Sequence, residues 1–301
     1  MWGADDRRAA PPPSPPVNDV EPPPRVGRLV LLGHPVAHSL SPRFQTAALW
    51  AAGVPLAYEA LDVAPPALAE SLRALGAVRA AGNATVPHKE GVARACAVLT
   101  PLAAAVGAAN TFWHDAAGRL TGDNTDVGGF DAAVRALVDP DAGGARVALV
   151  GAGGSAAAVV AAVSAWPGAR LTIWSRTAPR AEAVAARAPA CARACVHLAN
   201  ALDGATLVVN ATPLGLAPDD AFPVPVDQLP AGAAVFDLAY APSRTRWVRA
   251  ARAAGRVADD GLAMLVEQGA LAFRRWFGRE PDRAAMWAAL ADVTRARADA
   301  E

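Results

Sequence analysis

The chain has 301 residues, which is enough for two compact domains that each bury a core. Its 28 basic and 28 acidic residues cancel to a formal net charge of zero, so bulk electrostatics gives no reason to expect a nucleic acid or a membrane as partner. The composition, 53% hydrophobic and 19% charged, is typical of a soluble globular protein.

In the first half of the chain, strands alternate with helices. Residues 1–26 precede this pattern; they are rich in proline, cannot bury enough apolar surface to fold, and are expected to be disordered. The pattern then predicts strands at residues 28–32, 56–63 and 78–85, helices at 41–52, 66–75 and 89–98, and a hairpin over 111–120. Such alternation predicts an α/β fold with a largely parallel sheet.

A second unit of the same kind begins near Asp126. It is expected to contain helices at residues 126–138, 178–188, 262–277 and 282–297, and strands at 146–150, 171–174, 206–209 and 234–237. The stretch 147–169 carries no charge and is long enough to cross a membrane. Glycines at positions 151, 153 and 154 interrupt it, so we expect a buried strand, a turn and a buried helix to about residue 165 instead.

The three cysteines are Cys96, Cys191 and Cys195, which form neither an even disulfide framework nor a CxxC zinc pattern. On a helix, the spacing of Cys191 and Cys195 would place both thiols on one face. We expect free thiols in a reducing cytoplasm and no metal site.

A glycine-rich loop follows the strand at residues 146–150. Gly151 permits a tight turn, Gly153 lets the backbone approach a pyrophosphate, and Ala156 allows the next helix to pack closely on the strand. The free N–H groups of the first helical turn then face the phosphates. A turn without a ligand is the alternative, but the strand before the loop and the helix after it favour dinucleotide binding.

The next strand indicates which dinucleotide is bound. NAD enzymes usually carry Asp or Glu near its end, where the acid binds the ribose hydroxyls. Here the strand is followed by Ser175, Arg176 and Thr177, with Arg180 close behind and no acid. Two arginines and two hydroxyls suit a 2′-phosphate, and cations at the start of a helix oppose its dipole unless an anion is nearby. We therefore predict NADP(H), with solvated arginines as the alternative.

Lys89 is the only lysine of the chain, whose other basic residues are all arginine. Arginine keeps its proton, whereas lysine is a compact ammonium that can trade one. A surface lysine without a function is the alternative. The surrounding residues 83–90 (NATVPHKE) tie Lys89 to a recognisable site.

Polar residues gather where strands are expected to end, which is where open α/β sheets bind ligands. They lie in residues 33–42 (GHPVAHSLSP), 83–89 (NATVPHK), 107–111 (GAANT), 122–126 (GDNTD), 210–215 (NATPLG) and 260–268 (DGLAMLVEQ). Together with the glycine loop and residues 175–177 (SRT), and in this order, these motifs resemble the shikimate dehydrogenase family. The resemblance extends from about residue 27 to the last helix.

The resemblance implies reversible, NADPH-dependent reduction of 3-dehydroshikimate to shikimate. It implies two α/β domains with a cleft between them. The substrate-binding domain would cover residues 27–125, completed by 261–301, and a Rossmann-type NADP-binding domain would cover 126–260. The oligomeric state stays open between monomer and homodimer.

The resemblance also implies roles for individual residues. Lys89 and Asp126 would be the catalytic pair, because an ammonium can stabilise the charge that hydride delivery builds on a ketone oxygen and can supply the proton. A salt bridge at the domain junction is the alternative for this pair. Ser39 and Ser41 would bind the substrate carboxylate. The ring hydroxyls would be held by Thr85, Asn110 and Gln268, with Asn83 and Tyr240 nearby.

The cofactor contacts that the resemblance implies come from the glycine loop, the arginine loop and the nicotinamide side of the cleft. They are Gly151, Ala152, Gly153, Gly154, Ser155, Ser175, Arg176, Thr177, Arg180, Asn210, Thr212, Leu238, Gly261 and Met264. A core methionine is the alternative for Met264. His88 departs from the family pattern, and we expect it to be a packing substitution.

Two other functions stay open. A relative that also uses quinate, usually with NAD, would tend to have threonine at position 41. Ser41 therefore counts against quinate as substrate, and Arg176 counts against NAD as cofactor. A dinucleotide-binding regulator without turnover would not need Lys89 and Asp126.

Overall fold

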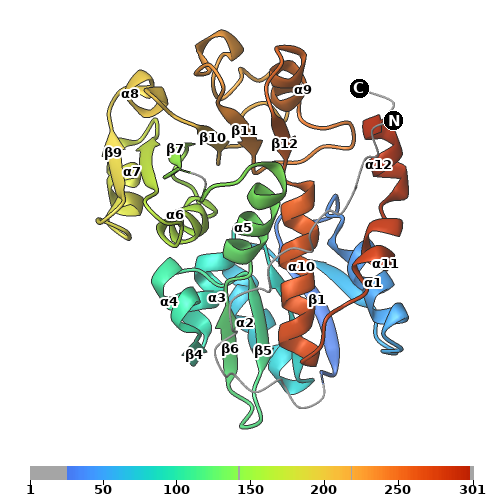
Figure 1. Cartoon of the computed structure of the whole chain (residues 1–301). Helices are drawn as coiled ribbons and strands as arrows, with labels where there is room; N and C mark the ends of the chain where they lie inside the picture. The colour runs from blue at the N-terminus through green and yellow to red at the C-terminus, as the bar shows by residue number, and fades with distance from the viewer. Residues whose placement is uncertain (1–25, 142, 218, 299–301) are drawn as a thin grey trace.

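The computed structural model describes residues 26–141, 143–217 and 219–298, so nearly all of the expected N-terminal extension lies outside the described residues. The described residues form two lobes, which Figure 1 shows one above the other, and each lobe is built on a six-stranded sheet. We call them the first lobe and the second lobe, in the order in which their strands occur along the chain.

The sheet of the first lobe is mixed, with the strand order β2-β1-β3-β5-β6-β4. Its strands are β1 (Arg28–Gly33), β2 (Tyr58–Asp62), β3 (Ala80–Ala84), β4 (Val98–Leu99), β5 (Thr111–His114) and β6 (Leu120–Asp123). Strands β1, β2 and β3 are parallel, as predicted, while β5 is antiparallel to both of its neighbours. The predicted hairpin is confirmed as β5–β6.

The helices of this lobe are α1 (Ser41–Ala51), α2 (Leu68–Ala77), α3 (Lys89–Ala95) and α4 (Pro101–Val106), with a 3₁₀ turn, η1 (Pro65–Ala67), before α2. Helix α3 is shorter than predicted because Val98 and Leu99 pair with β6 instead. Helix α4 was not predicted, although its sequence carries the usual signals for the start and the end of a helix. The Thr100 side chain caps its first turn, proline follows, and Gly107 ends it with a φ of 70°.

The sheet of the second lobe is parallel throughout, in the order β12-β11-β10-β7-β8-β9. Its strands are β7 (Arg146–Val150), β8 (Arg170–Trp174), β9 (Ala192–Cys195), β10 (Leu207–Asn210), β11 (Ala234–Asp237) and β12 (Ala258–Asp260). This is the doubly wound order of dinucleotide-binding folds, in which the ligand crevice lies where the strand order reverses. The reversal lies between β7 and β10, directly at the glycine loop.

The helices of the second lobe are α5 (Asp126–Leu137), α6 (Ala156–Ser164), α7 (Ala178–Ala185), α8 (Leu198–Leu202) and α9 (Arg246–Ala253), with a 3₁₀ turn, η2 (Val226–Gln228). Strands β9 and β12 and helices α8 and α9 were not predicted. Cys191 precedes β9 and Cys195 ends it, so the two thiols do not share a helix face. All three cysteines are free.

The C-terminal segment returns to the first lobe. It consists of α10 (Leu262–Phe277), α11 (Arg283–Ala288) and α12 (Ala291–Ala298), so the predicted helix at 282–297 is in fact two helices. Val266 and Phe273 of α10 are fully buried in one core with Leu29 of β1 and Phe44 of α1. This shared core supports the proposal that the first lobe is completed from the C-terminal side.

Helices α5 and α10 lie side by side between the two lobes (Figure 1). Gly129 of α5 permits this close approach, because a Cβ at that position would lie 2.7 Å from the Cβ of Gln268. The absence of a side chain at Gly129 therefore brings the start of α5, with Asp126, next to Gln268 of α10.

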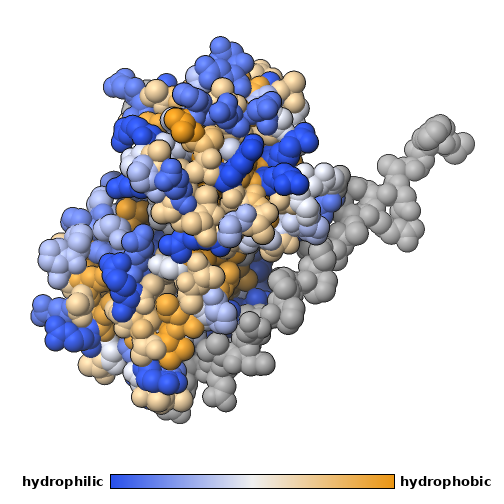
Figure 2. All heavy atoms as spheres, turned by 90° about the vertical axis from the view of Figure 1, so that its left-hand side faces the viewer, coloured by the Kyte–Doolittle hydropathy of each residue, from blue (hydrophilic) through white to orange (hydrophobic). Residues whose placement is uncertain are grey.

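Of the helices that the structure describes, none combines the length and the apolar character that a membrane crossing requires. On the side of the molecule shown in Figure 2, hydrophilic residues are spread over both lobes and apolar residues lie among them.

Candidate active site

A cavity of about 340 Å³ lies between the two lobes. Every residue that we predicted to bind substrate lines it: Ser39, Ser41, Asn83, Thr85, Asn110, Tyr240 and Gln268. Lys89 and Asp126 line it too, together with four residues predicted to contact the cofactor, Ser155, Leu238, Gly261 and Met264. The motifs that are dispersed along the chain therefore meet in one place.

Lys89 and Asp126 form an ion pair in the wall of this cavity. Lys89 is the first residue of α3 and Asp126 the first residue of α5, and Lys89 Nζ donates to Asp126 Oδ2 at 2.7 Å. Only 14% and 8% of the two side chains are exposed, so the pair is shielded from bulk water. Lys89 Nζ also donates to Ser155 Oγ of the second lobe at 3.4 Å.

Asn110 connects this ion pair to the rest of the polar wall. Its Nδ2 lies 2.8 Å from Asp126 Oδ1 and 3.2 Å from Gln268 Oε1, and its Oδ1 accepts a hydrogen bond from the backbone N–H of Thr125 at 2.7 Å. Asp126 is thus held by Lys89 on one oxygen and by Asn110 on the other. The amides of Asn110 and Gln268 are placed to exchange these internal bonds for bonds to a hydroxylated ligand.

Asn83 is more firmly engaged within the protein. Its Oδ1 accepts from the Tyr58 hydroxyl at 2.6 Å, and its Nδ2 donates to the Asn110 carbonyl at 3.1 Å and to Thr111 Oγ1 at 2.9 Å. Both N–H donors of the amide are therefore used. Asn83 therefore lines the cavity with its amide already bonded to Tyr58, Asn110 and Thr111.

Hydroxyl groups near the start of α1 also line the cavity. Ser39 Oγ accepts from the backbone N–H of Ser41 at 3.2 Å, and Ser41 begins α1. Burial raises the pKa of the Tyr240 hydroxyl, which interacts with the Ser39 side chain, so the phenol stays neutral and can donate a hydrogen bond. Hydroxyl donors beside a helix N-terminus suit an anionic group such as a carboxylate.

The glycine loop has the backbone that the sequence predicted. Gly151 has a φ of 109°, a conformation that residues with a side chain rarely adopt. A Cβ there would lie 2.7 Å from Thr212 Cγ2 and 2.9 Å from the Ala211 carbonyl, so the loop after β10 packs directly on the glycine loop. Ala156, which follows the loop, is fully buried at the start of α6.

Arg176 and Arg180 lie exposed after β8, and neither guanidinium has a carboxylate partner within the described residues. Arg180 is in the first turn of α7, where an unneutralised cation opposes the helix dipole. Thr177 is exposed beside them, and its backbone N–H donates to Ser175 Oγ at 3.3 Å. These groups are free to bind a phosphate.

A buried carboxylate that the sequence analysis did not single out holds the loops next to the cavity. Asp237 ends β11; its Oδ1 accepts from Asn210 Nδ2 at 2.9 Å and from the backbone N–H of Ala239 at 3.1 Å. Asn210 in turn accepts from the backbone N–H of Thr212 at 2.9 Å. Asn210 is fully buried, so it shapes the loop, while Thr212 is the more accessible of the two.

Burial raises the pKa of Asp237 from 3.8 to about 6, against the lowering effect of its hydrogen bonds from Thr245, Ala239 and Asn210. Below pH 4 Asp237 is protonated in the folded and the unfolded chain, whereas above pH 6 it is ionised in both, at a cost to the folded state. The stability that depends on Asp237 therefore falls as the pH rises from 4 to 6. An asparagine at this position would not titrate. We therefore expect the free energy of unfolding of Asp237→Asn to rise relative to that of the native protein, by up to about 3 kcal/mol, as the pH rises from 4 to 7.

Urea unfolding of both proteins at several pH values measures this difference. A stability difference that does not change with pH would contradict the assignment of the raised pKa to Asp237.

Asp260, at the end of β12, anchors the point where the chain returns to the first lobe. It is fully buried and pairs with Arg297 of α12 at 2.8 Å, and Arg297 also donates to the Ala241 carbonyl at 2.8 Å. Asp260 accepts from the backbone N–H of Thr245 at 3.2 Å as well. The last helix thus fixes the segment that carries Tyr240 into the cavity.

The sequence left the roles of His88 and Met264 open, and the structure shows where both residues lie. His88 is buried and its Nε2 lies 2.6 Å from the Val63 carbonyl, which agrees with the expected packing role. Met264 lines the cavity and also belongs to the core of the second lobe. Its position therefore agrees both with a cofactor contact and with a core methionine.

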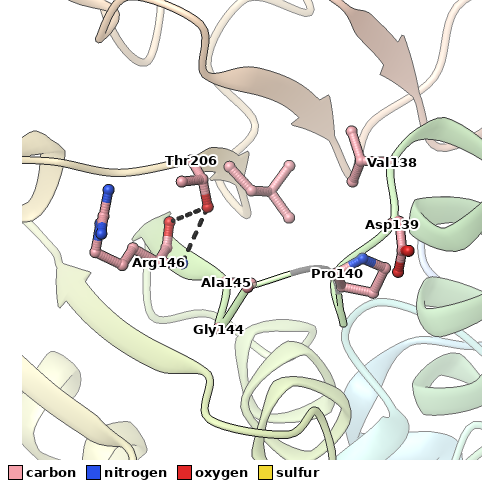
Figure 3. Close-up of a pocket in the computed structure, with 9 residues that line it drawn as sticks. Val138, Asp139, Pro140, Gly144, Ala145, Arg146 and Thr206 are labelled. Carbon is pink, nitrogen blue, oxygen red and sulfur yellow. Dashed lines mark hydrogen bonds between the residues drawn. The ribbon is translucent and has the colours of Figure 1, made fainter.

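A second cavity, of about 250 Å³, lies at the opposite end of the second sheet, where β7 and β10 begin (Figure 3). Polar groups of its lining already have partners: the Arg146 backbone N–H donates to Thr206 Oγ1 at 3.0 Å, and Asp139 Oδ1 accepts from the N–H of neighbouring Asp141 at 3.0 Å. Open α/β sheets bind ligands at the other end, where β7 leads into the glycine loop. We assign no ligand to this cavity.

Comparison with known proteins agrees with this geometry. Residues 31–112 match the shikimate dehydrogenase substrate binding domain, and residues 261–291 match the shikimate 5'-dehydrogenase C-terminal domain. The NADP⁺ shikimate dehydrogenase of Methylobacterium radiotolerans is 42% identical over 260 residues, which cover 84% of this chain and 92% of the relative. That of Salinibacter ruber is 44% identical over 275 residues, which cover 87% and 96%. The chain belongs to the shikimate dehydrogenase family.

Solved structures of the family have the same fold. Shikimate 5-dehydrogenase of Thermus thermophilus, in complex with NADP(H) and shikimate, is 39% identical with a TM-score of 0.79 and covers 89% of this chain and 99% of its own. Quinate dehydrogenase of Corynebacterium glutamicum, in complex with NAD, is 30% identical with a TM-score of 0.80 and covers 88% and 99%. The shikimate dehydrogenase fold is therefore confirmed, and it also occurs in a quinate enzyme.

Some residues of this site were not identified from the sequence. Asp237 ends the apolar strand β11, a position that could have marked it, whereas Asp260 opens the motif 260–268 but was given no role there. The hydrogen-bond partners of both acids lie on other elements. His38 and Val86, beside motif residues that were identified, also line the cavity.

Proposed function

We propose that this chain is an NADP-dependent shikimate dehydrogenase, which reversibly reduces 3-dehydroshikimate to shikimate. The shielded Lys89–Asp126 pair, set in a cavity lined by amides and hydroxyls and lying beside the glycine loop, is the observation that carries the proposal. The family membership supports it.

The residues present fit NADP(H). The glycine loop, with its positive φ at Gly151, would take the pyrophosphate at the start of α6. Arg176 and Arg180, which have no carboxylate partner among the described residues, would take the 2′-phosphate. Leu238, Gly261 and Met264 would lie beside the nicotinamide, since they line the cavity on the side of the second lobe. When bound, the reduced cofactor supplies the hydride.

Lys89 acts as the proton donor in reduction. Negative charge develops on the ketone oxygen, and the Lys89 ammonium stabilises that charge and transfers a proton from Nζ to the oxygen. In oxidation the neutral amine takes the proton from the substrate hydroxyl. Asp126, held on its other oxygen by Asn110, orients the amine and balances its charge.

The remaining cavity residues bind and orient the substrate. Ser39, Ser41 and Tyr240 hold its carboxylate, because they form a group of hydroxyls near the start of α1. Thr85, Asn110 and Gln268 hold the ring hydroxyls, with Asn83 supporting Asn110. Domain boundaries near residues 126 and 261 would place this site at the junction of the two domains.

We propose that the enzyme acts in the cytoplasm, in the biosynthesis of chorismate and aromatic amino acids. Three free cysteines agree with a reducing compartment. It acts as a monomer or a homodimer, which light scattering on the purified protein distinguishes.

The test measures absorbance of the reduced nicotinamide with the purified protein, pairing shikimate or quinate with NADP⁺ or NAD⁺. We expect strong turnover only with shikimate and NADP⁺. Comparable turnover with quinate or NAD⁺ would favour a quinate/shikimate dehydrogenase. Bound NADP⁺ without turnover in any of the four mixtures would favour a regulator.

A further inference from the structure

Ser155 stands where a serine usually caps a helix. At the residue before a helix, a serine side chain normally accepts a hydrogen bond from a backbone N–H of the first turn. Ser155 directly precedes α6 but makes no such bond, and its backbone is helical, with φ −90° and ψ −15°. Its hydroxyl instead accepts a hydrogen bond from Lys89 Nζ at 3.4 Å.

We propose that Ser155 is a positioning residue for Lys89, through which the glycine loop of the second lobe orients the amine of the first. This inference rests on the proposed function and adds to it, since the family resemblance implied only a cofactor contact for Ser155.

The geometry of an ammonium supports the proposal. A lysine ammonium has three N–H donors in a tetrahedral arrangement. Asp126 Oδ2 accepts one at 2.7 Å and Ser155 Oγ accepts a second at 3.4 Å. With two donors held, the direction of the third is defined, and the amine lies in the wall of the substrate cavity.

The position of Ser155 gives the contact a further consequence. Ser155 is part of the loop that would cradle the cofactor phosphates, so a change in that loop when NADP(H) binds reaches Lys89 Nζ through one hydrogen bond. Cofactor binding would therefore help to set the orientation of the proton donor.

Ser155→Ala removes the hydroxyl, and Ser164→Ala is the matched control, because Ser164 lies at the other end of α6 and its exposed hydroxyl donates to the Ala161 carbonyl at 2.8 Å. We expect Ser155→Ala to lower kcat for reduction about tenfold, the effect of one hydrogen bond to a charged group, and to change KM for NADPH less than about twofold.

Ser155→Thr keeps a hydroxyl and should recover most of the lost kcat, whereas Ser164→Ala should match the native protein throughout. A raised KM for NADPH with an unchanged kcat in Ser155→Ala would show that Ser155 acts on the cofactor alone, and the proposal would be wrong.

A second measurement does not depend on turnover. Because Lys89 is the only lysine, protein labelled with ¹³Cε-lysine gives a single lysine NMR signal. We expect Ser155→Ala to shift this signal and to weaken its response to added NADP⁺, and Ser164→Ala to leave both unchanged. An unaltered signal in Ser155→Ala overturns the proposal. If the native protein has no dehydrogenase activity, the proposed function fails, but this signal still shows whether Ser155 holds Lys89.

Discussion

Lys89→Ala is expected to leave the protein folded and to lower kcat about 10²- to 10⁴-fold, the usual contribution of a general acid or base. The fold should survive because Asp126 faces the cavity and keeps its hydrogen bond from Asn110. Steady-state rates in both directions, together with circular dichroism, measure the two effects.

Lys89→Arg should lose turnover as well, because arginine keeps the positive charge but does not release its proton. Arg94→Ala, on the solvent-exposed side of the same helix, is the control for the loss of a cation and should retain native rates. Native rates in Lys89→Ala would remove Lys89 from the chemistry and leave only a salt bridge at the domain junction.

Arg176→Ala is expected to raise KM for NADPH about 10- to 100-fold, the effect of losing one hydrogen bond between charged groups, and to change KM for NADH little. Arg176 has no carboxylate partner within the described residues, so its removal breaks no internal ion pair and should leave stability nearly unchanged. Kinetics with the two cofactors at fixed shikimate give the comparison.

Arg170→Ala is the matched control, since Arg170 is an exposed arginine at the opposite end of the same strand, β8. It should behave as the native protein with both cofactors. Equal weakening of NADPH and NADH by Arg176→Ala would refute the assignment of the 2′-phosphate.

The parts of the fold that sequence reasoning predicted well are those whose signals are local. The strand, loop and helix around Gly151 follow one another without interruption, and β7 has the predicted bounds. By contrast, β4, β9 and β12 have two to four residues each and exist because a neighbouring strand pairs with them. Such pairing leaves little trace in the sequence of the strand itself.

The same distinction holds for the site. The motifs predicted which residues line the cavity, because most of them are short runs with polar residues next to a strand, and the motif 260–268 runs into α10. The bonds between motifs were not predictable, since they depend on how the two lobes meet. Lys89 and Ser155 are 66 positions apart, and the Asp260–Arg297 pair joins a strand of the second lobe to the last helix. Pattern reasoning identified the separate groups but not their contacts.

The return of α10 to the first lobe has a consequence for the way the protein is made. During translation, the segment from β7 to β12 is made before α10, so most of the core of the second lobe, although not Met264, exists before α10 is synthesised. The core around Leu29 and Phe44 lacks Val266 and Phe273 until then, because these residues come from α10. We therefore expect the substrate side of the cleft to mature last, only after α10 has been synthesised.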